Sequence, residues 1–394
     1  MLDSIFIGMS GLQGYSRGLK VIANNTANMN TPGFKSSSLQ FSDMFYSGNA
    51  INGSASNFGQ IGHGLNTNGT SLNFKQGDLR QTGNPLDLAM DGDGLFTLKN
   101  SNGKFFYTKA GQFEFNSDGT LVNRADGAKV MGRDSNGNLT ELSFKGAHSN
   151  SAKASSSIKF IGNLSSTASN QSVGAVKVID SAGGEHTLTL NFTNTNATTA
   201  GSWKVEIMDG TTAVATTQII FENGKPTVAT AKLNFSYTTS GLPAIPIQLD
   251  FSSDVTSFAS GNISTLAFGS QDGYAPGTLT GITFDTAGAM VLAYSNGQTV
   301  KGSKLAFGRF DTIDGVEAVG GNLFQPTNDK VWHFGTAGGN GFGNVKSGMV
   351  EVSNVDLSQE FSDLVIMQRG YQASSQIVTT ANEMIQELFA MKGK

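Results

Sequence analysis

The most constraining feature of this sequence is an apolar repeat of three and four residues at each end of the chain. Near the N-terminus the repeat runs through Ile5, Met9, Leu12, Leu19 and Ile22. Near the C-terminus the repeat has five positions spaced seven apart and four interleaved ones: Leu357, Leu364, Tyr371, Val378 and Ile385, with Phe361, Met367, Ala381 and Leu388. Such spacing aligns apolar side chains along one seam of a helix. It predicts helices over 1–30 and 356–394 that form a coiled-coil-like pair.

The sequence between these ends follows a different period. Segments such as "HTLTLNFT", "SWKVEIM" and "KLNFSY" alternate apolar and polar residues, which is typical of β-strands. An aromatic residue followed by polar residues and a Gly recurs after Phe113, Ile219 and Ile282, and it predicts β-hairpin turns. The predicted fold class is therefore mixed and mainly β.

Two stretches rich in Ser, Asn and Gly, 145–157 and 268–278, are typical of joints between domains. They bracket a Thr-rich segment with strong strand signals. We therefore expect two β domains, with the outer one inserted into the inner one. The predicted division is terminal helices over 1–30 and 356–394, extended connecting segments over 31–69 and 346–355, an inner β domain over 70–150 and 273–345, and an outer β domain over 151–272.

Charge and composition exclude several classes of partner and location. The formal net charge is −4 and charged residues make up only 14% of the chain, so a basic footprint for nucleic acid or an anionic membrane surface is absent. The sequence contains no apolar run of about 18 residues, so no segment is predicted to insert into a membrane. The N-terminus lacks the pattern of a cleaved secretory signal, which by itself predicts a cytosolic protein. The absence of cysteine excludes disulfides and thiolate chemistry.

The segments that match parts of catalytic or metal-binding motifs suit structural roles. "GYSRG" matches a nucleophile elbow at Ser16, but this serine falls within the predicted first helix rather than between a strand and a helix. "DSNGNLTE" from Asp134 and "MDGDGLF" around Asp91 lack the full spacing of a calcium loop and suit tight turns. The four histidines are scattered, at His63, His148, His186 and His333. We predict no catalytic, cofactor-binding or metal site, and no enzyme activity.

The two apolar seams require a partner. Fully burying each large aliphatic side chain contributes roughly 1.5–3 kcal/mol, so isolated seams would forgo well over about 10 kcal/mol. In one interpretation the helices pair only with each other within a monomer. In the other they pair and then pack against further copies, giving a polymer with helices inside and β domains outside. Low charge favours the polymer, because repeated like-charged surfaces would repel.

Three motifs resemble those of one known family. "ANNTANMNTPGFK", at 23–35, resembles the N-terminal signature of bacterial flagellar rod and hook proteins. "SNVDLSQEFSDLVIMQRGYQASSQIVTTANEMIQELF", at 353–389, is similar to their C-terminal signature, and "TGNPLDLAMDGDGLFTL" with "FYTKAGQFEFNSDGTLVN" is similar to their central segment. The resemblance covers about 1–145 and 275–394 and leaves the inserted segment outside it. Within the family, the distal rod protein lacks a large insertion, so 151–272 favours the hook members.

The resemblance implies a structural subunit that polymerises with itself into a curved, flexible tube between the flagellar rod and the filament, and transmits motor torque. It implies distal rod, hook cap and hook–filament junction proteins as partners. It also implies export by the flagellar type III apparatus without a cleaved signal, to the extracellular hook attached to the basal body. The alternatives are the distal rod protein and, from other classes, a secreted cell-wall-acting enzyme or an adhesin. An enzyme would call for paired carboxylates at a cleft.

The N-terminal signature has its own structural interpretation. Asn24 and Asn28 lie four apart and can share a helical face, whereas Asn25 points elsewhere. We expect these amides to bond to neighbouring subunits. Beyond Asn30, the residues Thr31, Pro32 and Gly33 should end the helix and turn the chain, and Phe34 should anchor that exit by packing.

Overall fold

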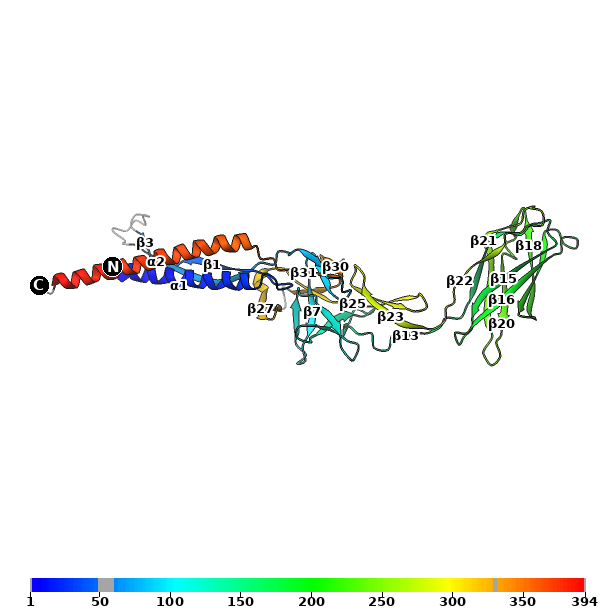
Figure 1. Ribbon diagram of the computed structural model, residues 1–394, viewed down its shortest axis with the longest axis horizontal. Helices are drawn as coiled ribbons and strands as arrows, with labels where there is room; N and C mark the ends of the chain where they lie inside the picture. Colours follow the sequence, from blue (N-terminus) through cyan, green and yellow to red (C-terminus); the bar gives the residue numbers. More distant parts are fainter. Residues whose placement is uncertain (1, 49–59, 329–331, 340, 393–394) are drawn as a thin grey trace. The chain divides into compact units, whose positions relative to one another are not determined.

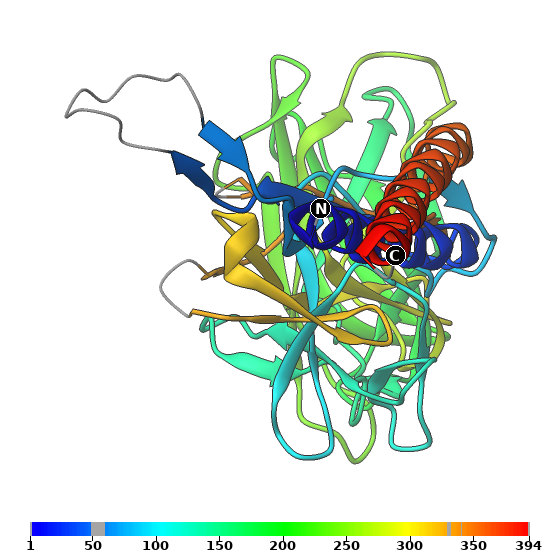
Figure 2. The same ribbon diagram turned by 90° about the vertical axis from the view of Figure 1, so that its left-hand side faces the viewer.

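The two terminal repeats form the two α-helices of the structure, as predicted. The computed structural model describes residues 2–48, 60–328, 332–339 and 341–392. Helix α1 comprises Leu2–Ala27 and helix α2 comprises Leu357–Lys392, and the two lie side by side (Figures 1 and 2). Between them the described regular elements are β-strands and one 3₁₀ turn, so the predicted mixed, mainly β class is confirmed.

The chain divides into two compact units. Unit 1 comprises 1–145, 282–291 and 301–394, and unit 2 comprises 146–281 and 292–300. Three strands have residues in both units: β23 (Gly277–Phe284), β24 (Ala289–Tyr294) and β25 (Thr299–Leu305). Both helices therefore belong to unit 1, together with the central segment that resembles rod and hook proteins.

Unit 1 contains many short strands. Its N-terminal strands are β1 (Ser37–Asp43), β2 (Tyr46–Gly48), β3 (Gln60–Gly62), β4 (Leu65–Leu72), β5 (Leu79–Gln81), β6 (Leu88–Asp91), β7 (Leu95–Lys99), β8 (Phe105–Thr108), β9 (Phe113–Phe115), β10 (Leu121–Asn123), β11 (Lys129–Arg133) and β12 (Leu139–Glu141). Its C-terminal elements are β26 (Phe307–Phe310), the 3₁₀ turn η1 (Ile313–Gly315), β27 (Val316–Gly320), β28 (Leu323–Pro326), β29 (Trp332–Gly335), β30 (Asn344–Ser347) and β31 (Met349–Glu351).

The sheets of unit 1 join segments from both ends of the chain. β7 pairs with β8, β11 and β26, while β28 pairs with β8 and β27. β30 pairs antiparallel with β6, and β31 pairs antiparallel with β5. Aromatic side chains fill the core, with Phe96 against Phe113 and Phe307 at centroid distances of 5.1 and 5.2 Å. Burial of these rings holds together strands that are far apart in sequence.

The segments predicted as connections, 31–69 and 346–355, contain paired strands. β1 and β4 form an antiparallel two-stranded ribbon, from Ser37 opposite Leu72 to Asp43 opposite Leu65. This ribbon contacts α1, where Tyr15 approaches Phe41 with ring centroids 6.0 Å apart. α1 thus contacts both α2 and the β1–β4 ribbon.

Unit 2 is a β-sandwich. Its strands are β13 (Ser149–Asn150), β14 (Ser157–Asn163), β15 (Asn170–Ile179), β16 (Glu185–Asn194), β17 (Ser202–Asp209), β18 (Thr212–Glu222), β19 (Lys225–Pro226), β20 (Lys232–Tyr237), β21 (Ile245–Thr256) and β22 (Ala267–Gln271). One sheet has the order β20-β21-β14-β22 and the other runs from β15 to β19 in sequence order. Phe251 of the first sheet meets Phe192 of the second at a centroid distance of 6.1 Å, so the inner faces share one core.

The two predicted joints lie next to each other within unit 2. Lys153 and Tyr274 form an antiparallel bridge, exchanging backbone hydrogen bonds of 2.9 Å. Asp272 accepts hydrogen bonds from the backbone of Ser156 and Ser157 and pairs with Lys153 at 3.0 Å. Burial opposes ionisation of Asp272, but these hydrogen bonds hold its pKa well below its usual range. The carboxylate therefore fastens the entering and leaving chains together.

The three predicted hairpin turns are confirmed. They connect β9 with β10, β18 with β19, and β23 with β24. In each turn a glycine, Gly119, Gly224 or Gly288, has φ between 72 and 76°. This left-handed conformation favours glycine because a Cβ would meet the following carbonyl.

Edge strand β15 contains a bulge with a strained residue, and replacing that residue should stabilise unit 2. Ala175 has φ of 56°, and the pairing with β16 shifts register between Val173 and Val176. Holding an alanine in the left-handed region costs about 1–2 kcal/mol, and a glycine avoids this strain. Glycine loses more conformational entropy on folding, which offsets about 0.5–1 kcal/mol of that gain. We expect Ala175→Gly to raise the free energy of unfolding by about 0.5–1 kcal/mol.

Urea unfolding followed by fluorescence of Trp203, which is buried in unit 2, measures this change. A Trp332→Phe background removes the signal of unit 1, since the chain has 2 tryptophans. An unchanged or lower stability of the glycine variant would show that the bulge is not strained.

Candidate assembly site

Helices α1 and α2 approach each other through glycines. A Cβ placed on Gly8 would lie 2.7 Å from Val378 Cγ2, and one on Gly18 would lie 2.8 Å from Met367 Sδ. In the other direction, a Cβ on Gly370 would lie 2.5 Å from the ring of Tyr15. Each larger side chain therefore fills the space left by a glycine on the facing helix. This interlocking fixes the antiparallel alignment of the pair.

The face of α1 that is buried differs from the predicted seam and shares only Ile22 with it, so a role of the other seam residues in assembly remains a prediction. The buried residues are Gly8, Gly11, Gly14, Gly18, Ile22 and Asn25. Ile5, Leu12 and Leu19 are only half-buried, and Met9 is exposed. The buried line passes through Gly11 and Gly18, one residue before Leu12 and Leu19, which is about 100° around a helix of ~3.6 residues per turn. The spacing of apolar residues could not predict this buried line, because glycine has no apolar side chain.

The predicted seam of α2 is divided between two faces. Leu364, Met367, Val378, Ala381 and Ile385 lie on the covered face, together with the buried Ser374. The other predicted positions, Leu357, Phe361, Tyr371 and Leu388, are exposed. Their role in assembly remains a prediction, because an exposed apolar side chain on a helix is available to another molecule.

Asn25 of the N-terminal signature connects three elements. Its amide nitrogen donates to Ser37 O at 2.8 Å and to Glu360 Oε1 at 2.9 Å, and its amide oxygen accepts the N–H of Ser37 at 3.1 Å. Asn25 is buried, and burial raises the pKa of Glu360 against the effect of this hydrogen bond. The asparagine therefore ties the end of α1 to the start of both β1 and α2.

The neighbouring asparagines are used differently. Asn28 donates to Asn24 O at 2.9 Å and accepts a hydrogen bond from the Thr31 hydroxyl at 3.1 Å. Asn24 and Asn30 are exposed. Asn24 and Asn28 thus share a face as expected, but the Asn28 amide already bonds within its own chain. Contact of these amides with a neighbouring subunit remains a prediction.

The turn after α1 is held closely against the β-structure. Gly33 has φ of 71°, and a Cβ there would lie 2.5 Å from Ala110 N. Pro32 O accepts a hydrogen bond from the Asn322 amide at 2.9 Å. Phe34 is half-buried, and its carbonyl accepts a long hydrogen bond of 3.4 Å from Asn354 N. Only glycine fits at Gly33, for both conformational and steric reasons.

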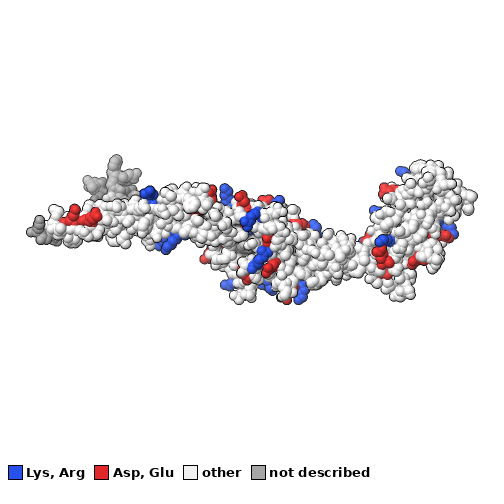
Figure 3. Space-filling view, viewed as in Figure 1, with Lys and Arg blue, Asp and Glu red and all other residues white. Residues whose placement is uncertain are grey.

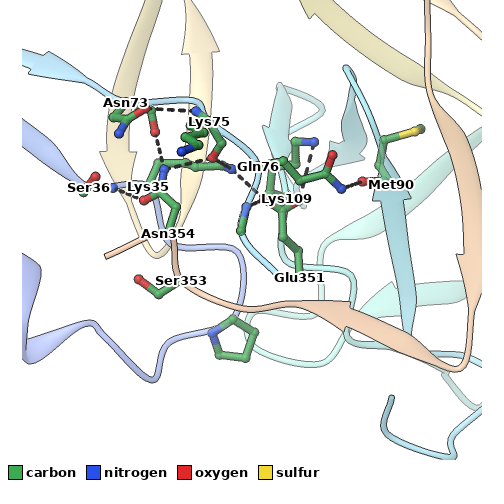
Figure 4. Close-up of polar contacts among 12 residues, drawn as sticks. Lys35, Ser36, Asn73, Lys75, Gln76, Met90, Lys109, Glu351, Ser353 and Asn354 are labelled. Carbon is green, nitrogen blue, oxygen red and sulfur yellow. Dashed lines mark hydrogen bonds and ion pairs between the residues drawn. The ribbon is translucent and has the colours of Figure 1, made fainter. Parts of the chain in front are cut away.

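A buried ion cluster, defined here as Lys35, Lys109 and Glu351, lies beyond this turn (Figure 4). Lys35 Nζ lies 2.6 Å from Glu351 Oε1 with both side chains at 0% exposure, and Lys109 Nζ lies 3.5 Å from Glu351 Oε2. Gly77 N donates to Glu351 Oε1 at 3.0 Å. Burial lowers the pKa of Lys109, although Glu351 opposes that shift. The cluster joins the segment after α1 to the end of β31.

Asn354 extends this connection by hydrogen bonds alone. Its amide oxygen accepts the N–H of Ser36 at 2.8 Å, and its amide nitrogen donates to Asn73 O and Lys75 O at 2.7 and 2.9 Å. Lys75 O also accepts from Lys35 Nζ at 2.8 Å. The segment that follows α1 and the segment that leads into α2 are therefore fixed to each other and to the β-structure (Figure 4).

The segments that resemble catalytic or metal-binding motifs lie in a helix, in turns and on strands. Ser16 lies within α1, which excludes a nucleophile elbow. Asp134 accepts hydrogen bonds from the backbone of Asn136 and Asn138, as expected of a turn. His186 and His333 each contact one aspartate, Asp180 at 2.8 Å and Asp311 at 2.7 Å. Across the described ranges, no three His, Cys, Asp or Glu side chains gather as a metal site would require. None of the helices described here is both long and apolar enough to cross a membrane.

Comparison with known proteins gives consistent matches at three places. Residues 5–35 match the family model "Flagella basal body rod protein", residues 89–164 match "Flagellar hook protein FlgE/F/G D1 domain", and residues 346–391 match "Flagellar basal body rod FlgEFG protein C-terminal". The three models follow the order of the three motifs in the sequence. The first covers most of α1 and the turn that follows it, and the last covers β31 and nearly all of α2.

Relatives match over the whole chain. The flagellar hook protein FlgE of Borreliella burgdorferi is 28% identical, covering 100% of both chains, and that of Escherichia coli is 29% identical, covering 98% of both. A crystal structure of Helicobacter pylori flagellar hook protein FlgE2 aligns with a TM-score of 0.53 at 15% identity, covering 69% of this chain and all of the other. That structural likeness supports the fold.

Proposed function

This chain belongs to the bacterial flagellar rod and hook protein family, and we propose that it is the structural subunit of the flagellar hook. The observation that carries this proposal is the full-length match to hook proteins, which includes the inserted segment that forms unit 2. A distal rod protein without a large insertion would leave that segment unmatched. The match therefore favours hook over rod.

The surface of the subunit supports a role in assembly. Large apolar side chains on both helices are exposed in the single chain, among them Phe6, Phe361 and Phe389 at 65, 55 and 72%. Charged side chains are sparse over the visible face (Figure 3). Apolar helices therefore supply the surfaces for polymerisation, and the few charges limit repulsion between copies.

We further propose the partners and location that follow from this function. The homopolymer extends from the distal rod to the hook–filament junction proteins and grows under the hook cap protein. The chain reaches the outside through the flagellar type III export apparatus, without a cleaved signal peptide. It acts as a flexible coupling that transmits motor torque and performs no catalysis. Such a tube is a heterologous assembly, in which the repeated contact does not close into a ring.

Negative-stain microscopy of the concentrated protein tests the proposal. We expect tubes from the full chain and none from a version lacking 1–30 and 356–394, which removes both helices but keeps Lys35 and Glu351. Tubes from both versions would contradict assembly through the helices. Full chain that forms no tubes and clears peptidoglycan would instead support the cell-wall enzyme.

A further inference from the structure

Arg309 on strand β26 carries hydrogen-bond donors that its own chain does not use. A guanidinium presents several N–H donors, yet none of the described residues accepts a hydrogen bond from Arg309, and its Nε is buried without a partner. Asp311 Oδ1 lies 3.7 Å from a terminal nitrogen, beyond hydrogen-bond distance. The guanidinium carbon lies 5.9 Å from the centre of the Phe342 ring, which orients the group. A buried donor is costly unless it meets an acceptor, so this position favours a bound ligand.

Arg309 lines a cavity of about 230 Å³ within unit 1. Segments far apart in the sequence form the wall of this cavity, namely 74–76, 92–95, Lys109 and 309–310. The charged side chains among these described lining residues are mostly cationic, with Lys75, Lys109 and Arg309 against Asp93. Cavities that hold drug-sized ligands typically measure about 300–1,000 Å³, so this one suits a smaller ligand, and its charges favour an anion.

Lys109 is the buried cation of this cavity, and it lacks a full counter-charge. Its side chain is only 6% exposed, and its Nζ donates to Gly92 O at 2.9 Å. Glu351 Oε2 lies 3.5 Å away, and the same carboxylate pairs more closely with Lys35, at 2.6 Å. Burial opposes the charge of Lys109 and lowers its pKa. Two cations therefore share one carboxylate in the buried ion cluster, and an anion in the cavity would supply the charge that is missing.

The wall of the cavity beside Lys109 is fixed by hydrogen bonds. Gln76 donates to Met90 O at 3.0 Å and accepts the N–H of Gly92 at 2.9 Å. Because Lys109 binds the carbonyl of the same glycine, both backbone polar groups of Gly92 are occupied. Figure 4 shows Gln76, Met90 and Lys109 together around this position. A ligand would therefore meet groups that are already in place, which lowers the cost of binding.

We propose that this cavity binds a small tetrahedral oxyanion of the phosphate or sulfate class between Arg309 and Lys109. A guanidinium can donate to two oxygens of such an ion at once, and an ammonium adds a compact positive charge. A dianion balances the excess of cations over carboxylates in the lining, whereas a monocarboxylate supplies half of that charge. Because the site lies within one copy, the ion binds whether or not the chain assembles.

Isothermal titration calorimetry with inorganic phosphate and with sulfate tests the site. We expect saturable binding of one ion per chain, and binding at least about tenfold weaker in Arg309→Gln, because charge-assisted hydrogen bonds are lost. Arg124→Gln is the matched control, since the Arg124 guanidinium lies outside the cavity and pairs with Asp87 at 3.2 Å. It should bind as the unaltered chain does. Absence of saturable binding to the unaltered chain, or equal binding by Arg309→Gln, would overturn the proposal.

Asp93→Asn tests the site from the opposite direction. Asp93 is exposed, so the substitution should leave folding intact, and it removes the carboxylate that repels an anion in the cavity. Phosphate and sulfate should therefore bind more tightly to this variant than to the unaltered chain. Acetate, the probe with a single charge, should bind more weakly than either. Unchanged or weaker sulfate binding by Asp93→Asn, or acetate binding equal to that of sulfate, would contradict a dianion in this cavity.

Stability gives a second readout, because an ion that binds only the folded chain raises its free energy of unfolding. Phosphate and sulfate also stabilise proteins generally by exclusion from their surfaces, so unit 2 is the internal reference. Urea unfolding followed by Trp332 in a Trp203→Phe background reports unit 1, and Trp203 in a Trp332→Phe background reports unit 2. We expect millimolar sulfate to raise the urea midpoint of unit 1 more than that of unit 2. Equal shifts in both units would mean that the cavity holds no ion.

Discussion

Glu351→Gln is expected to lower the free energy of unfolding of unit 1 by about 3–5 kcal/mol, because the change leaves the cations of Lys35 and Lys109 without their counter-ion in a buried site. The glutamine keeps the size of the side chain and can still accept hydrogen bonds from Lys35 and Gly77. The expected loss is therefore mainly electrostatic. Urea unfolding followed by Trp332 fluorescence in a Trp203→Phe background measures unit 1 alone, since the chain has 2 tryptophans.

Glu141→Gln is the matched control for this substitution. Glu141 also pairs with two lysines, Lys99 at 3.4 Å and Lys129 at 2.8 Å, but its side chain is 33% exposed. Pairs of this kind contribute about 0–1 kcal/mol. Equal effects of the two substitutions would show that burial does not govern the energetics of the cluster around Glu351.

The same variant has a predictable dependence on pH. Because burial lowers the pKa of Lys109, the folded chain binds fewer protons than the unfolded chain between the lowered value and the usual lysine pKa. The free energy of unfolding therefore rises with pH across that interval. Glu351→Gln removes the carboxylate that stabilises charged Lys109. As the pH rises, Lys109 loses its charge and this stabilisation matters less. We therefore expect the difference in unfolding free energy between the unaltered chain and the variant to shrink as the pH rises.

Gly33→Ala should destabilise unit 1 by about 2–5 kcal/mol. About 1–2 kcal/mol comes from holding an alanine at φ of 71°. A further 1–3 kcal/mol or so comes from the Cβ, which would lie 2.5 Å from Ala110 N, a backbone atom that cannot move alone. The expected consequence is that the turn after α1 separates from the segment directly after β8, which contains Lys109, and that the buried ion cluster is weakened as well.

Gly83→Ala isolates the conformational part of this effect. Gly83 has φ of 78°, and a Cβ there would have nothing within 4 Å. We expect a loss of no more than about 1–2 kcal/mol at this position. The same fluorescence-detected unfolding measures both variants. If they lose equal stability, the close approach of Gly33 to Ala110 contributes nothing.

The architecture was predictable where the sequence carries a periodic signal. The heptads gave both helices, and the three Gly-containing turns gave their hairpins, because these features depend on neighbouring residues. The face of α1 that meets α2 was not predictable from apolar spacing, since close helix contact uses Gly8, Gly11 and Gly18. Their own spacing of three and seven residues is the signal that could have revealed it.

The buried ion cluster was missed for a different reason. Lys35 and Glu351 are 316 residues apart, and no local pattern relates them. Lysine and glutamate are also among the residues least expected in a core. Asn25 was singled out only as part of a motif, and its burial against Ser37 and Glu360 depends on three segments meeting in space. Long-range polar contacts of this kind leave little trace in a single sequence.

The pairing of strands from opposite ends of the chain also imposes an order on folding. Arg80 pairs with Val350 and Met90 pairs with Val345, so closing unit 1 brings together residues about 260 positions apart. The sandwich strands β14 to β22 lie within one continuous stretch and can fold earlier. Until β31 arrives, β5 has an unpaired edge, and Lys35 and Lys109 have no carboxylate. A copy of this chain that stops before Met349 would therefore remain unfinished and accessible to proteases, whereas one that continues through α2 becomes protected.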